Sequence, residues 1–127
     1  MYLFLDAVGR RLGLCKEGGS VSWSDLEAED DRFPDLLKHA LPQRESLKMV
    51  EAIVVAQEGA RFSDVRAAVV VANGLHFTHG IPVYDLRSQP IPEACTRSWL
   101  ESLSSHPDGI KASYFAPPSI STSSTSA

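Results

Sequence analysis

The stretch FSDVRAAVVVANGLHFTHGIP, residues 62–82, decides how this chain is expected to fold. Near its start it carries a hydroxyl and two charges, but after Arg66 it contains no Asp, Glu, Lys or Arg until Asp85. A helix on the surface of a small soluble domain is normally apolar along one stripe only. This stretch is apolar on more than one side, so it needs cover from its own sheet and from something else.

The ends of this segment carry the marks of a complete helix over residues 64–79. Ser63 is the candidate N-cap, and Asp64 suits the positive end of the helix dipole. Gly80, followed by Pro82, is typical of a helix end. We therefore expect a finished helix that is packed within protein.

Working outward from this helix, the chain alternates short apolar runs with helical patterns. Strands are predicted in residues 1–6, twice in the hairpin 10–26, and in 51–59 and 81–86; helices are predicted in 33–41 and 92–103. This order of elements is typical of an α/β domain. We assign residues 1–106 to one domain and residues 107–127, rich in Ser, Thr and Pro, to a disordered tail.

Composition and charge exclude several classes of function. The net charge of -4 argues against a broad nucleic-acid surface, since phosphate binding depends on clustered Lys and Arg. Cys15 and Cys95 match no metal or redox spacing, which favours two reduced thiols in a cytoplasmic protein. Residues 1–9 lack a basic n-region, so no signal peptide is expected, and the polar residues Asn73 and His76 argue against a membrane span.

The frame of Arg66, Ala72, Gly74-Leu75 and Gly80-Ile81-Pro82 resembles, without a gap, the signature of the TsaB (YeaZ) family. Residues 2–14, YLFLDAVGRRLGL, resemble the opening of that family, and residues 110–121 resemble its closing segment. The resemblance covers about residues 1–103, and the second half-domain of a full TsaB is missing. It implies a single ribonuclease H-like half-domain of the actin-like ATPase superfamily, with a mixed five-stranded sheet and about three helices.

Departures from the family pattern concern the nucleotide site. The first turn reads Asp6-Ala7-Val8-Gly9, so the acid is kept and the phosphate-binding hydroxyls are lost. The glycine-rich turn before the long helix is reduced to Glu58-Gly59-Ala60. A single lobe also lacks the opposite wall of a nucleotide cleft. We expect no bound cofactor and no metal.

The resemblance implies a non-catalytic partner that supports TsaD in making threonylcarbamoyladenosine (t6A) in tRNA, with tRNA contacted only indirectly. In the TsaB family the two helices of this half-domain pack against the same helices of TsaD or of a second TsaB. The corresponding interface residues expected here are Leu37, Val65, Val69, Ala72, Asn73 and His76. The alternative is that neighbouring elements of the chain itself, above all helix 33–41, bury both sides of the long helix.

Two other functions stay open at this stage. One is a self-associating, degenerate TsaB-like domain without a role in tRNA modification. The other is a small metal-dependent hydrolase of the ribonuclease H type centred on Asp6, with Asp85 as a candidate second ligand. His76 and His79 lie three apart on one helix face, but no further ligand completes a metal site. Ser63 lacks the context of a nucleophile.

Overall fold

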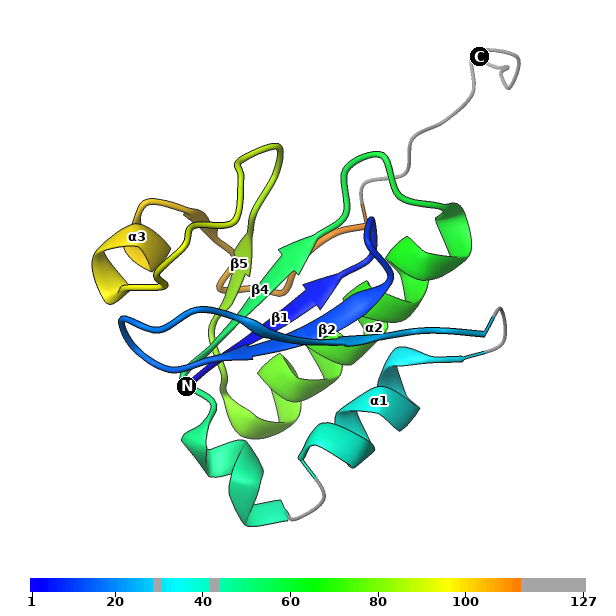
Figure 1. Cartoon of the computed structure of the whole chain (residues 1–127), viewed down its shortest axis with the longest axis horizontal. Helices are drawn as coiled ribbons and strands as arrows, with labels where there is room; N and C mark the ends of the chain where they lie inside the picture. Colours follow the sequence, from blue (N-terminus) through cyan, green and yellow to red (C-terminus); the bar gives the residue numbers. More distant parts are fainter. Residues whose placement is uncertain (29–30, 42–43, 113–127) are drawn as a thin grey trace.

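The computed structural model describes residues 1–28, 31–41 and 44–112. Within these ranges the chain is an α/β domain with one mixed six-stranded sheet, three α-helices and one 3-10 helix (Figure 1). The strands are β1 Tyr2–Asp6, β2 Arg11–Cys15, β3 Ser22–Asp25, β4 Ala52–Ala56, β5 Val83–Asp85 and β6 Ser104–Ser105. The helices are α1 Phe33–Ala40, η1 Arg44–Met49, α2 Phe62–His79 and α3 Arg97–Glu101.

The sheet has the strand order β3-β2-β1-β4-β5-β6. The first three strands form an antiparallel meander, and β1, β4 and β5 run parallel, with Leu3 opposite Ile53 and Ile53 opposite Val83. β1 and β4 are central and buried along their whole length. Their apolar runs, YLFL and AIVVA, are what strands covered on both faces require.

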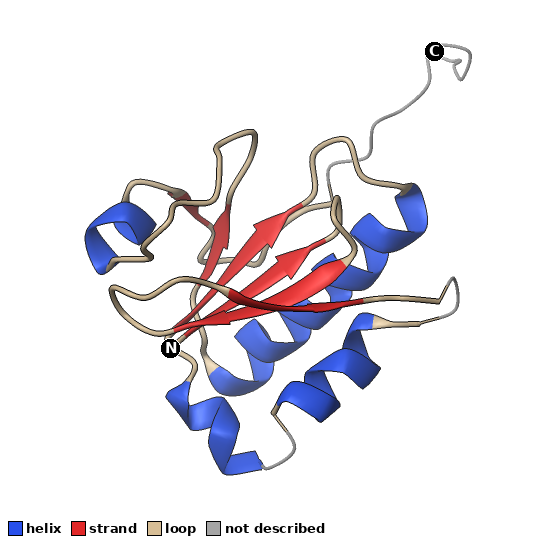
Figure 2. Cartoon of the chain, viewed as in Figure 1, coloured by secondary structure: helices blue, strands red, loops and turns tan. Residues whose placement is uncertain are grey.

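The side chains of the sheet alternate between two apolar layers. Leu3, Leu5, Ile53 and Val55 belong to the core that includes α2 and the inner residues of α1. Tyr2, Phe4, Ala52 and Val54 belong to a second core with Cys95, Leu100 and Leu103, on the side of α3. Figure 2 shows α1 and α2 together on one face of the sheet and α3 apart from them. Both faces of the sheet are therefore covered within the domain.

The predicted order of elements is confirmed, but the expected number of five strands is wrong. β6 adds a sixth strand, pairing Ser104 with Asp85 in an antiparallel arrangement. Two exposed serines have no hydrophobic period, so sequence pattern alone does not reveal such a strand. The last helix is also shorter than predicted: it begins after Thr96, whose hydroxyl accepts the backbone N–H of Trp99 at 3.1 Å.

Helix α2 begins two residues earlier than predicted, and Ser63 is not its N-cap. Arg61 occupies the N-cap position, and Ser63 is an exposed residue in the first turn. Asp64 lies in the first turn and Gly80 ends the helix in the left-handed conformation, with φ of 68°, as the sequence predicts. In the part of the chain that the structure describes, no helix combines the length and the apolar character needed to cross a lipid bilayer.

The segment after His106 also packs on the domain. Ile110 is 2% exposed and belongs to the core around α2. The sequence assigns residues 107–127 to a tail with almost nothing to bury; residues 107–112 instead contribute this core side chain. The rest of that tail, residues 113–127, lies outside the described residues.

Candidate protein-interaction surface on helix α2

The stripe of α2 that the sequence suggests as a partner interface faces the chain's own sheet. Val65 and Ala72 are completely buried, and Val69 is 8% exposed. All three belong to the core that includes Leu3 and Ile53 of the sheet. In this fold their side chains are packed against the chain's own sheet, so the expected role of these three residues in pairing with another protein does not fit the structure.

The sequence pattern was ambiguous because α2 has apolar residues nearly all the way round. Hydrophobic periodicity identifies the buried face only when the opposite face is polar. In α2, Val69 and Val70 are neighbours in the sequence, yet one is 8% and the other 63% exposed. Only the position of the sheet distinguishes them.

The exposed side of α2 carries a different set of residues, which we call the outward stripe. It consists of Phe62, Arg66, Val70, Gly74 and Phe77, all exposed. Three of these are large apolar side chains, with exposed fractions of 61% for Phe62, 63% for Val70 and 66% for Phe77. Among the described residues the other large apolar side chains that are more than half exposed are Val8 and Met49. Clustering of exposed apolar groups on one helix is typical of an interaction surface.

Helix α1 lies beside α2 (Figure 1), yet the large side chains of the outward stripe stay more than half exposed. Phe33 is fully buried, and Leu37 is half-buried and packs against the core. Leu37, also expected at the interface, is thus placed at the edge of the domain core. The alternative in which the first helix buries the second on its outer side is not what the structure shows.

A surface groove runs between the start of α1 and the first half of α2, with a volume of about 390 Å³. Its apolar lining comes from Pro34, Phe62, Ala67, Val70 and Val71, with Ser63 beside them. Arg32 and Arg66 also line it. Within the described part of the chain, neither guanidinium has an ion-pair partner. We refer to this feature as the α1–α2 groove.

The other two expected interface residues, Asn73 and His76, hold the C-terminal segment of the chain itself. Asn73 Nδ2 donates to the carbonyl of Ile110 at 2.9 Å, and the N–H of Ile110 donates to Asn73 Oδ1 at 2.8 Å. The ring nitrogens of His76 each lie 2.9 Å from a carbonyl oxygen, those of Ile81 and Pro107. Asn73 and His76 therefore act within the domain.

Gln57 also holds this C-terminal segment, and the sequence analysis did not identify it. Its side chain is fully buried, and Nε2 donates to the carbonyl of Lys111 at 3.0 Å. A buried amide needs partners, because leaving it without hydrogen bonds costs free energy. The signal in the sequence was a glutamine directly after the buried strand AIVVA, where β4 ends.

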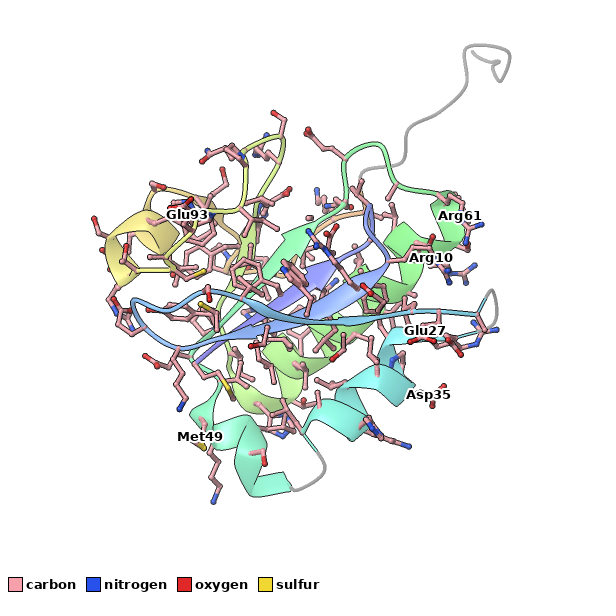
Figure 3. The ribbon with its side chains drawn as sticks, viewed as in Figure 1. Arg10, Glu27, Asp35, Met49, Arg61 and Glu93 are labelled. Atoms are coloured by element: carbon pink, nitrogen blue, oxygen red, sulfur yellow. The ribbon has the colours of Figure 1, made fainter. Side chains whose placement is uncertain are left out.

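The first turn of α2 is fixed by two arginines that share one carboxylate. Asp64 is 7% exposed and accepts from Arg10 Nε at 3.3 Å and from Arg61 Nε at 3.0 Å. Figure 3 shows Arg10 and Arg61 close together beside this end of the helix. Arg10 also donates to the carbonyl of Leu26, so the β1–β2 turn, the end of β3 and α2 are joined.

Asp6, the centre of the hydrolase alternative, is engaged in structural contacts. Its Oδ1 accepts from the N–H of Gly9 at 3.0 Å, and its Oδ2 accepts from Arg11 Nε at 2.8 Å. The guanidinium of Arg11 also lies 3.8 Å over the ring of Trp23. Asp85 accepts from the N–H of Arg87 in the next turn. Among the described residues, no three His, Cys, Asp or Glu side chains form a group that could hold a metal ion.

A polar network lies at the opposite end of the central strands. The hydroxyl of Tyr2 donates to Glu17, which also accepts from the N–H of Arg97. Burial, and then the hydrogen bond to Glu17, raise the pKa of Tyr2 to about 12. The same hydrogen bond, followed by that of Arg97, lowers the pKa of Glu17. Glu51 accepts from Arg97 at 2.9 Å.

Both cysteines are free and buried, and they lie side by side. Cys15 Sγ and the N–H of Cys95 share one acceptor, the carbonyl of Gly19, at 3.1 and 2.8 Å. Burial, followed by a hydrogen bond with Cys15, raises the pKa of Cys95 to about 12. The raised pKa keeps the Cys95 thiol protonated and therefore a poor nucleophile, because the thiolate is the reactive form.

No protein-family model, curated protein or solved structure matches this chain. The class that the observations define is an α/β domain with a mixed sheet and an exposed apolar stripe on its long helix.

Proposed function

We propose that this chain is a non-catalytic, TsaB-like partner protein of the cytoplasm that supports a TsaD protein in forming t6A in tRNA. Contact is made by the outward stripe of α2 together with the neighbouring part of α1. In this proposal the chain holds no nucleotide and does not itself bind tRNA. Its role is to bind and stabilise the enzyme that performs the transfer.

The observation that carries the proposal is the outward stripe itself. Phe62, Val70 and Phe77 are each more than half exposed on one helix, and contact with a partner would remove this apolar surface from water. The residues of the TsaB-like frame include Arg66 and Gly74 of the same stripe. Interface chemistry and sequence resemblance thus point to the same helix.

The topology supports the ribonuclease H-like part of the proposal. An antiparallel meander β3-β2-β1 followed by parallel β4 and β5 is the arrangement that the resemblance leads one to expect. The contacts of Asp6 with Gly9 and Arg11 give this acid a structural role. They favour the partner function over the hydrolase alternative.

The test is co-purification and size-exclusion chromatography of the chain, alone and mixed with the TsaD protein of the same organism. We expect a complex with one copy of each protein. Val70→Arg should abolish it, because a charge in the middle of the stripe must be desolvated on contact. Val8→Arg, which makes the same change at another exposed valine, is the control and should leave the complex intact.

Three outcomes are distinguishable. If the complex survives Val70→Arg, the outward stripe is not part of the interface. A chain that ignores TsaD but dimerises, with Val70→Arg abolishing the dimer, supports the self-associating alternative. A chain that remains a monomer in every mixture contradicts the proposed function.

A further inference from the structure

We propose that the α1–α2 groove binds an amphipathic helix of the partner whose apolar face is flanked by carboxylates, placed against Arg32 and Arg66. This inference rests on the proposed function, since it names the chemistry of the segment that covers the outward stripe. It concerns the first half of α2 and the beginning of α1, whose apolar side chains line the groove together with Arg32 and Arg66.

The shape of the groove suits side chains of another helix. Its lining combines the ring of Phe62 and the side chain of Val70, both more than half exposed, with the smaller Ala67 and Pro34. Pro34 lies at the first turn of α1 and presents no backbone N–H there. A partner helix laid into such a groove buries residues at i, i+3 or i+4 and i+7, the usual mode of helix-in-groove recognition.

The charge of the groove selects an acidic partner. The two other arginines near this end of the molecule, Arg10 and Arg61, are already bound to Asp64. Arg32 and Arg66 have no such carboxylate among the described residues, although the chain carries a net charge of -4. Guanidinium groups beside an apolar surface bind carboxylates well, because they are planar and weakly hydrated.

The two arginines are not equivalent. Arg32 also borders a second hollow that contains Asp31 and Asp35, so part of its positive potential is offset. Arg66 lies within the outward stripe, and none of the described residues that line the groove around it is acidic. Replacing Arg66 should therefore weaken binding more than replacing Arg32.

A second copy of the chain fits the groove poorly. In a twofold contact the same surface meets itself, so the arginine-bearing groove would lie against a second copy of the same basic surface. Like charges brought together at an interface disfavour association. Nucleic acid is also a poor fit, since two arginines on a chain of net negative charge make too small a basic surface.

The experiment measures the affinity of TsaD for the full chain by titration calorimetry at low and high salt. Arg66→Glu should weaken binding at least tenfold, Arg32→Glu less, and wild-type affinity should fall with salt. Lys38→Glu changes the same charge at an exposed position of α1 outside the groove and should keep wild-type affinity. Circular dichroism establishes that each variant is folded.

The inference is separable from the proposed function. If Val70→Arg abolishes binding while Arg66→Glu and Arg32→Glu bind like wild type, the TsaD partnership stands and the acidic helix is refuted. If wild type does not bind TsaD, two synthetic helical peptides decide instead. They share one leucine face and carry either glutamates or lysines beside it. Shifts in the NMR signals of groove residues with the glutamate peptide alone support the inference; shifts with neither, or with both equally, overturn it.

Discussion

The side-chain amide of Asn73 binds both polar backbone groups of Ile110: the carbonyl at 2.9 Å and the N–H at 2.8 Å. Two hydrogen bonds from one side chain thereby join residues that are 37 positions apart in the sequence. Gly109 has a φ of 91°, and a side chain there would place its Cβ 3.0 Å from Asn73 Oδ1 and from the ring of Phe77. The segment after β6 thus packs closely against α2 at Asn73 and Phe77.

Removing the amide of Asn73 should loosen this segment. Asn73→Leu leaves the N–H and carbonyl of the buried Ile110 without partners, at a cost of about 2–3 kcal/mol in the free energy of unfolding. Urea denaturation measures the loss, and amide exchange should quicken at Ile110. Gln89→Leu, which removes an exposed amide in a turn, serves as the control and should change stability little. Equal stability of Asn73→Leu and wild type would contradict the role assigned to Asn73.

The two faces of α2 should respond in opposite ways to the same substitution. Ala72→Arg places a guanidinium in the core, where an unpaired charge cannot be accommodated, and should prevent folding. Val70→Arg, two residues earlier, points outward and should retain the thermal midpoint of wild type within a few degrees. Far-ultraviolet circular dichroism during heating distinguishes them. A folded Ala72→Arg variant would show that the buried face is wrongly placed.

Stability should fall at both ends of the pH range because of the network around Tyr2. The pKa of Tyr2 is raised from 10.0 to about 12, so the folded state favours the neutral phenol. Its contribution is complete below pH 10 and is lost as the pH rises from about 10 to 12. The pKa of Glu17 is lowered, so its contribution is present above the usual value of 4.5 and is lost as the pH falls below it.

Thermal midpoints measured from pH 3 to pH 12 test this pair. Tyr2→Phe removes the ionisable hydroxyl and should reduce the alkaline loss, and it also removes the main cause of the lowered pKa of Glu17. The acid limb should therefore become shallower as well. An alkaline limb that is unchanged in Tyr2→Phe would assign the loss to other groups.

The thiols should be unreactive in the folded protein. Cys15 and Cys95 are buried, and burial raises the pKa of Cys95 to about 12, so almost none of its thiolate exists at pH 8. A thiol reagent such as dithiobis-nitrobenzoate should label both cysteines at once in guanidinium chloride and only slowly in buffer. Rapid labelling of Cys95 in buffer would indicate that the loop before α3 opens readily.

The contacts of Asp6 predict a structural effect of its replacement. Asp6→Asn keeps the shape of the side chain but removes the charge that binds Arg11 at 2.8 Å, and should cost about 1–2 kcal/mol. Calorimetry with Mg²⁺ completes the test, because the hydrolase alternative requires metal uptake that this variant abolishes. Binding of Mg²⁺ by the wild-type protein but not by Asp6→Asn would favour the hydrolase alternative over the partner function.

Most of the elements follow from local properties of the sequence. The apolar runs YLFL and AIVVA specify central strands, since no surface strand carries such residues on both faces. Gly80 ends α2 because a left-handed φ suits glycine, and this rule needs no information about distant residues. β6, with only Ser104 and Ser105, carries no such local signal and exists through its pairing with β5.

Which face of α2 is buried does not follow from the local sequence. Its composition shows that the helix needs cover on two sides, but Val69 and Val70 are chemically identical, and only packing on the sheet decides which one is buried. The sequence alone also leaves open whether Asn73 and His76 face a partner. In the fold, Asn73 binds the backbone of Ile110 and His76 contacts the carbonyl of Pro107. Such contacts join residues far apart in the chain, so they depend on the assembled fold and not on local sequence preference.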